Sequence, residues 1–247
     1  MWLLSTLSGL VLVCSLVSAV QVDIVGLGSV NGKEDIARDG TRYYSFLGIP
    51  YLEPPLADLR FKPGVPAKPW SGVRDATKFG NKCIQFNMYG DESPGEPVGS
   101  EDCLFINVFT KSTSVTAKKP VIFWIHGGAF IFGGVSGFGA KYMLEQDVVF
   151  VTVQYRLGVF GFLSTEDKNA PGNYGLHDQQ AGLQWVQDHI HHFGGDKDKV
   201  NIMGCSAGGA SVHYHLLSPR AAGLFNGAVS MSGSALCWWA NLPNQRI

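Results

Sequence analysis

The sequence predicts an α/β fold built on a mostly parallel sheet with flanking helices. Three observations lead to this prediction. An apolar stretch at 200–203 runs directly into Gly-Cys-Ser-Ala-Gly at 204–208, and a helix-like segment follows. A second apolar stretch, 121–125, runs into His-Gly-Gly-Ala-Phe at 126–130. Strand-like and helix-like segments alternate between the two motifs, which is typical of parallel sheets.

The N-terminal part is expected to contain strands separated by irregular segments. Residues 21–50 indicate a hairpin region, with Asn-Gly at 31–32 as its turn. Residues 51–69 are proline-rich and irregular, and residues 83–103 form a polar loop rich in glycine and proline. Residues 104–109 have the pattern of a strand.

The middle of the chain contains two buried strands and the clearest helix. Residues 121–125 and 148–155 are apolar runs typical of strands buried on both faces. Residues 173–193 predict a helix that Gly-Gly at 194–195 ends. The apolar face of this helix consists of Leu176, Leu183, Val186 and Ile190.

The last predicted elements surround the Gly-Cys-Ser-Ala-Gly motif. Residues 200–203 form the strand before it, residues 206–217 the helix after it, and residues 224–230 another strand. A sharp strand-to-helix turn would present the hydroxyl of Ser206 at the carboxyl edge of the sheet. The alternative is a serine in an ordinary glycine-rich turn, but the strand before the motif and the second glycine motif favour the sharp turn.

The second motif, at 126–130, follows the buried strand at 121–125. Glycines there let backbone N–H groups approach a carbonyl oxygen on which negative charge develops during acyl transfer. The alternative is a phosphate-binding loop, since 133–137 is also glycine-rich. However, the sequence lacks G-x-x-x-x-G-K-[ST] and the spacing of a dinucleotide-binding motif, so no nucleotide cofactor is expected.

With these motifs in place, the chain resembles a type-B carboxylesterase, in the cholinesterase/carboxylesterase family of α/β-hydrolases. The resemblance extends from Gln21 to about Gly233 and is closest to the insect esterase branch. Six stretches carry it in the family's order: 44–51, 101–108, 124–128, 155–164, 172–179 and 204–219. It implies an α/β-hydrolase fold and the hydrolysis of carboxyl esters, with a small-molecule ester as partner and no cofactor or metal.

The motifs and the resemblance together assign roles to named residues. Ser206 would be the nucleophile, activated by a base that accepts its proton. The oxyanion hole would use the backbone N–H groups of Gly128, Ala129 and Ala207, and Gly127 would shape the loop.

The chain departs from the family pattern because it offers no acid and no base after Ser206. No Asp or Glu occurs there, and the two histidines are His213 and His215. His213 lies seven residues along the same helix, about 10 Å down its axis, and cannot reach the hydroxyl. His126 has no evident acid partner. The chain is therefore expected to be the N-terminal part of a longer domain, truncated after the strand at 224–230, and to be inactive and poorly soluble by itself.

Two further groups of residues contain reactive side chains. Cys205 could be an alternative nucleophile, but the turn exposes only the serine, so a small buried thiol is expected. Asp188, His189, His191 and His192 could suggest a metal site. Because their spacing supplies no third ligand on one face, a solvated helix end is expected instead.

Composition excludes several function classes. The 247 residues include 19 Lys and Arg and 20 Asp and Glu, for a formal net charge of −1, and no basic patch suggests nucleic acid as a partner. Apolar residues make up 45%, which suits a single globular domain over 20–247. Oligomeric state stays open.

Residues 1–19 have the pattern of a cleaved secretory signal peptide, which predicts a secreted protein. They are apolar and end in a small-x-small pattern at 17–19, although no Lys or Arg precedes the apolar run. The alternative is a membrane anchor, but the interspersed serines make this segment poorly suited to anchoring in a bilayer. No other segment is long and apolar enough to span a bilayer.

Cys83 and Cys103 bracket a loop that looks like a disulfide-closed Ω-loop, and the resemblance implies the same pair. The alternative is two free buried thiols. Cys237 is expected to be free or to pair outside the chain. The resemblance also implies two buried ion pairs, Arg60 with Glu101 and Arg156 with Asp178, against the alternative of exposed charges that contribute little.

The substrate is expected to be an apolar carboxyl ester. Residues 83–103 contain no tryptophan, which argues against choline esters because cholinesterases hold the cation on one. Cys205 stands where juvenile hormone esterases typically carry Gln. The alternatives are an inactive truncated isoform or a non-catalytic binding or adhesion-type family member, but such members usually lose the serine.

Overall fold

The computed structural model describes residues 20–87 and 95–241, so the predicted signal peptide and part of the Cys83–Cys103 loop lie outside the described residues. Its sheet contains β1 (Val20–Ile24), β2 (Gly28–Ile36), β3 (Arg42–Pro50), β4 (Val73–Asp75), β7 (Phe105–Thr110), β8 (Lys119–Ile125), β9 (Val149–Val153), β10 (Gly195–Cys205) and β11 (Gly227–Met231). Its α-helices are α1 (Gly158–Phe162), α2 (Tyr174–His189) and α3 (Ala207–Leu217). Short elements complete it: β5 (Gln85–Phe86), β6 (Pro97–Val98), η1 (Ala57–Leu59), η2 (Met143–Glu145), η3 (Ile190–Phe193) and η4 (Pro219–Ala221).

The predicted α/β architecture is confirmed, and the sheet has two differently paired halves. Its strand order is β1-β2-β3-β7-β9-β8-β10-β11, with β4 paired to β2. From β1 through β3 and β7 to β9, each strand pairs antiparallel with the next. From β9 through β8 and β10 to β11, the pairing is parallel. The parallel half contains both glycine motifs.

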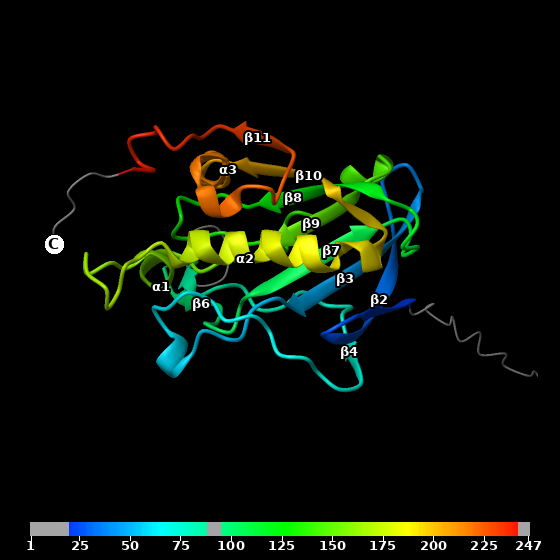
Figure 1. Cartoon of the computed structure of the whole chain (residues 1–247), viewed down its shortest axis with the longest axis horizontal. Helices are drawn as coiled ribbons and strands as arrows, with labels where there is room; N and C mark the ends of the chain where they lie inside the picture. The colour runs from blue at the N-terminus through cyan, green and yellow to red at the C-terminus, as the bar shows by residue number, and fades with distance from the viewer. Residues whose placement is uncertain (1–19, 88–94, 242–247) are drawn as a thin grey trace, which may run out of the picture.

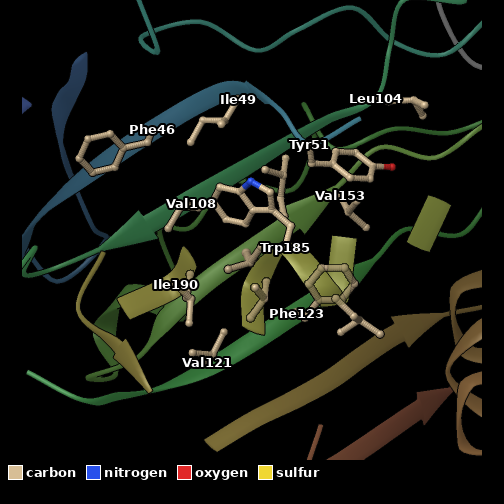
Figure 2. Packing of buried hydrophobic residues seen from close by; sticks show 14 of the residues in the cluster. Phe46, Ile49, Tyr51, Leu104, Val108, Val121, Phe123, Val153, Trp185 and Ile190 are labelled. Atoms are coloured by element: carbon tan, nitrogen blue, oxygen red, sulfur yellow. The ribbon is translucent and has the colours of Figure 1, made fainter. Parts of the chain in front are cut away.

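The helices cover one face of the sheet. Helix α2 runs across this face and α3 lies over β10 and β11 (Figure 1). The larger hydrophobic cluster lies between α2 and the strands, and Figure 2 shows Trp185 and Ile190 facing Phe123, Val153 and Val108. Alternate residues of β8 point the other way, so Trp124 joins a smaller cluster on the opposite face with Phe150 and Leu144.

The predicted hairpin turn at Asn31-Gly32 is wrong. Both residues lie inside β2, where Asn31 pairs with Gln21 of β1, and the chain reverses at 25–27 instead. A Cβ on Gly32 would lie 2.7 Å from the Phe46 ring and 2.7 Å from the Ser45 carbonyl oxygen. Gly32 is therefore required by close packing against β3, which a local turn pattern does not reveal.

Candidate functional site

Ser206 occupies the junction between β10 and α3, as the sequence predicts. Its backbone has φ 58° and ψ −120°, a conformation that non-glycine residues adopt rarely. Two hydrogen bonds hold it there: its N–H donates to the Met231 carbonyl at 2.8 Å, and its carbonyl accepts from the Ala210 N–H at 2.9 Å. The serine is thus fixed by β11 on one side and by the first turn of α3 on the other.

Glycines allow α3 to begin directly against the sheet. A Cβ on Gly204 would collide with the carbonyl oxygen of Gly208, across the turn that contains Ser206. A Cβ on Gly208 would collide with the carbonyl oxygen of Ile125, at the end of β8. The G-x-S-x-G spacing therefore reflects two backbone contacts, one within the turn and one with the neighbouring strand.

The loop of residues 126–133, hereafter the 126–133 loop, follows β8 and lies against the Ser206 turn. A Cβ on Gly127 would stand 2.5 Å from the Cys205 carbonyl oxygen and 3.1 Å from Cβ of Ser206. Gly128, Ala129 and Phe130 have φ of 112°, 53° and 63°. β8 and β10 are parallel neighbours, so their carboxyl ends, and with them the two motifs, meet at one edge of the sheet.

Backbone N–H groups are available where the oxyanion hole is predicted. Within the described part of the chain, the amides of Gly128, Ala129 and Ala207 have no hydrogen-bond acceptor. The carbonyl of Gly128 is occupied, since it accepts from Ile131 and Phe132 at 3.0 Å each. This turn leaves the amide side of the loop free to bind an anion.

A cavity of about 440 Å³ opens beside Ser206. Its floor consists of Gly127, Gly128 and Ser206, and apolar side chains that include Trp124, Phe138 and Met231 line its walls. Cys205 also lines it and is partly exposed, so the expectation of a fully buried thiol does not hold. The side chain at 205 therefore faces the same space as the serine.

The histidines near Ser206 have other partners. His213 Nδ1 accepts the Ala235 N–H at 3.2 Å, and His215 Nε2 lies 3.0 Å from Gln179 Oε1. Burial lowers the pKa of His215 to about 4, which keeps its ring neutral. Among the described residues, no histidine hydrogen-bonds to the Ser206 hydroxyl. The described residues thus place Ser206 beside backbone N–H groups that have no acceptor, and none of their histidines is hydrogen-bonded to it.

The two expected ion pairs both form, in different surroundings. Arg156 Nε and Nη2 donate to Asp178 at 2.7 Å each, and the exposed fractions of the two side chains are 3% and 0%. Burial alone would lower the pKa of Arg156, but hydrogen bonds and the charge of Asp178 outweigh it and the pKa is raised. Arg60 and Glu101 make the same two-bond contact at 2.6 Å, yet their side chains are 42% and 17% exposed, so this pair is not buried.

The Cys83–Cys103 disulfide is present, and a residue beside it contacts the 126–133 loop. Gln85 Nε2 donates to the Gly133 carbonyl at 2.8 Å, and its Oε1 accepts the Gly133 N–H at 2.7 Å. Gln85 could not be predicted from the sequence, because no local pattern marks a glutamine whose partner lies 48 residues away. The disulfide loop is thereby tied to the far end of the 126–133 loop.

The histidines that follow α2 in η3 contact the backbone and one another. His192 Nε2 accepts the Val25 N–H at 3.3 Å, and the rings of His191 and His192 lie 3.9 Å apart. Across the residues that the structure describes, no group of three or more potential metal ligands is found. The same residues include no helix that is both long and apolar enough to cross a membrane.

Comparison with known proteins agrees with this arrangement. A sequence model of the carboxylesterase family matches residues 18–246. A juvenile hormone esterase from Tribolium castaneum is 48% identical over 219 residues, which cover 88% of this chain and 37% of that protein. Esterase FE4 from Myzus persicae is 44% identical over 241 residues, covering 96% and 42% of the two chains. A pyrethroid hydrolase from Rattus norvegicus is 43% identical over 258 residues, covering 98% and 44%. The chain spans about two-fifths of the length of these relatives.

Proposed function

The chain belongs to the carboxylesterase family, and we propose that its protein is a serine hydrolase of apolar carboxyl esters. The observation that supports this most directly is the strained Ser206 turn facing a loop with free amides. A strained serine next to unpaired N–H groups has no structural benefit by itself, but it is what acyl transfer requires.

The reaction would proceed through an acyl-enzyme. The Ser206 oxygen attacks the ester carbonyl carbon while a base takes the hydroxyl proton. The carbonyl π electrons move to the oxygen, and the N–H groups of Gly128, Ala129 and Ala207 stabilise that charge. The oxyanion electrons re-form the C=O bond as the C–O bond to the alcohol breaks, and the protonated base gives its proton to the leaving oxygen. Water, deprotonated by the base, then attacks the acyl group on Ser206 in the same way, and the serine oxygen leaves with the proton as the acid is released. We propose that the base and its acid partner come from outside the described residues.

The walls of the cavity support an apolar substrate. Trp124, Phe138 and Met231 surround the space next to Ser206, and none of the described residues that line it is charged. One relative is named for the hydrolysis of pyrethroids and another for juvenile hormone. This chain differs from a choline-binding enzyme in lacking a tryptophan between Cys83 and Cys103.

We further propose that the protein is secreted. Residues 1–19 have the pattern of a cleaved signal peptide, and the Cys83–Cys103 disulfide suits an oxidising compartment. Release of full-length protein into the medium, with an N-terminus at residue 20, would be the expected result. Retention in the membrane with an intact N-terminus would contradict it.

The competing function is a non-catalytic binding protein of the same fold. The strained conformation of Ser206 favours the enzyme, because a binding protein has no need to keep it. The test is hydrolysis of a short-chain aryl ester by the full-length protein, comparing Ser206→Ala with Ser218→Ala. Ser218 lies at the other end of α3 and makes no side-chain capping bond, which makes it a matched control.

Ser206→Ala should reduce kcat/KM more than about a thousandfold, because it removes the covalent nucleophile. Ser218→Ala should retain the parent activity. If the alanine variant at 206 keeps a tenth of the activity, the proposed nucleophile is wrong. If the full-length parent hydrolyses no ester, the result favours the non-catalytic binding function.

A further inference from the structure

His126 begins the 126–133 loop, and its side chain is fully buried. Its Nδ1 lies 2.8 Å from the carbonyl oxygen of Gly127. A carbonyl can only accept, so Nδ1 carries the proton and donates it. Burial lowers the pKa of His126 to about 4, and the ring is therefore neutral near pH 7. Nε2 has no hydrogen-bond partner among the described residues. Within them, the ring is therefore oriented by its hydrogen bond to Gly127.

The carbonyl that His126 holds belongs to the peptide unit that contains a proposed oxyanion donor. The C=O of Gly127 and the N–H of Gly128 share one planar trans peptide and point in opposite directions. Fixing the direction of the carbonyl therefore fixes the direction of the N–H. Glycine at 127 and at 128 would otherwise let this peptide rotate at little cost. A hydrogen bond to the carbonyl also polarises the N–H on the other side of the unit.

Tyr155 holds His126 from the neighbouring strand end. It lies two residues beyond β9, is fully buried, and donates its hydroxyl proton to the His126 carbonyl at 2.8 Å. The two rings stack with centroids 4.4 Å apart and planes at 21°. Burial raises the pKa of Tyr155, so the phenol remains a donor. The backbone and the ring of His126 are thus both fixed by one side chain.

Gly133 packs closely against the hydrogen bond between His126 and Gly127. A Cβ at that position would lie 2.5 Å from the Gly127 carbonyl oxygen and 2.7 Å from His126 Nδ1. The loop therefore folds back tightly over the hydrogen bond, and Gln85 holds Gly133 through both of its backbone polar groups. There is little room for the Gly127 carbonyl to turn away from the imidazole.

We propose that His126 and Tyr155 are positioning residues that aim the Gly128 N–H at the developing oxyanion. This inference rests on the proposed esterase function and assigns these two residues a task within it. Neither residue lines the cavity beside Ser206. They act through the Gly127–Gly128 peptide, so their effect falls on the transition state, where the oxygen becomes charged, more than on ground-state binding.

The test compares His126→Asn with His126→Leu in the full-length protein. The side chains of Asn and Leu are similar in size, and both remove the ring and its stacking on Tyr155. Asn Nδ2 stands at the branch position of His Nδ1 and can donate to Gly127, whereas Leu has a methyl group there. Any difference between the two variants therefore reports on the hydrogen bond rather than on lost packing.

His126→Leu should lower kcat for an aryl ester by about 10² with KM changed less than about threefold, since one oxyanion donor contributes about 10²–10³. The kcat of His126→Asn should be at least about tenfold higher than that of His126→Leu. Inhibition by an aryl trifluoromethyl ketone, which forms a tetrahedral adduct with Ser206, should weaken in parallel with kcat/KM. Inhibition by the product alcohol, which carries no oxyanion, should stay unchanged.

The outcomes separate this inference from the proposed function. If the parent is inactive, or if Ser206→Ala stays active, the esterase function fails. If the parent is active and Ser206→Ala is not, but the Asn and Leu variants have equal kcat values, the positioning role alone is overturned. Should neither variant fold, Tyr155→Phe keeps the ring stacking and removes one hydroxyl. It should lower kcat about tenfold at unchanged KM, and a parent-like kcat would overturn the inference.

Discussion

The antiparallel and parallel halves of the sheet differ in how they are built and in what they carry. β1, β2 and β3 follow one another in the chain and pair as neighbours, so short connections suffice. β8, β9, β10 and β11 also follow one another in the chain, but their order in the sheet is β9-β8-β10-β11 and they pair in parallel. Parallel pairing needs longer connections, and those after β9 and β10 contain α2 and α3. The carboxyl ends of these strands lie at one edge, where the Ser206 turn and the 126–133 loop meet. The parallel half can therefore assemble a site from distant segments, which is the general behaviour of open parallel sheets.

Burial also distinguishes two ion pairs of the molecule. Arg156 and Asp178 join the end of β9 to α2 without solvent, while Arg60 and Glu101 join two loops with solvent access. Both pairs make two guanidinium–carboxylate hydrogen bonds, but Asp178 also accepts the Arg156 backbone N–H and Arg156 also donates to the Lys62 carbonyl. Burial and these added bonds should together make the Arg156–Asp178 pair the stronger of the two. The following experiments on the full-length protein test this contrast.

The largest effect is expected for Asp178→Asn. This change leaves the Arg156 guanidinium buried without its counter-charge, which costs about 3–5 kcal/mol. The free energy of unfolding from urea titration measures it. A loss below about 1 kcal/mol would show that Arg156 finds water or another partner, and that burial does not distinguish the two pairs.

Removal of the disulfide should follow in size. Cys83 and Cys103 are 20 residues apart, and opening a loop of this length is expected to destabilise the protein by about 3 kcal/mol. The double substitution to Ser, studied by the same titration, measures it. Non-reducing peptide mapping of the parent serves as the control, because two alkylatable thiols would contradict the bond itself.

The parallel half should also make stability depend on pH. His126 and His215 both have folded pKa values of about 4, against 6.5 ordinarily. As pH falls below 6.5, the unfolded chain binds protons before the folded protein does. Each histidine should therefore lower the free energy of unfolding by about 1 kcal/mol per pH unit, levelling off near pH 4. Urea titrations between pH 4 and pH 7.5 measure the slope.

His215→Gln is the matched variant for the pH experiment, since it keeps a polar group near Gln179 and cannot titrate. It should flatten the slope relative to the parent. A slope equal to that of the parent would mean that His215 can be protonated in place without loss of stability.

The smallest effect is expected for Glu101→Gln. The pair with Arg60 is partly exposed, and such pairs contribute about 0–1 kcal/mol. The change in the free energy of unfolding, set beside that of Asp178→Asn, completes the comparison. A loss of several kcal/mol would show that hydrogen-bond geometry, rather than burial, sets the strength of these pairs.

The local features of this protein can be predicted from its amino-acid sequence. Ser206 could be placed at a strand-to-helix turn because the glycine spacing and the apolar run before it are contiguous in the chain. The strands around 104–109, 121–125 and 224–230 could be found for the same reason. Gln85 and Tyr155 could not, because their partners lie 48 and 29 residues away and only the tertiary fold brings them together.

At some positions, contacts between distant segments give a residue a role that differs from the one its local sequence pattern predicts. Asn31-Gly32 has the sequence of a turn, yet β2 is paired along its length and Gly32 is needed for contact with Phe46. Cys205 was expected to be buried, but the 126–133 loop leaves it facing the cavity beside Ser206. Local propensities are worth about 1 kcal/mol per residue, whereas fully burying one large apolar side chain contributes about 1.5–3 kcal/mol. Packing between segments therefore overrides them wherever the two disagree.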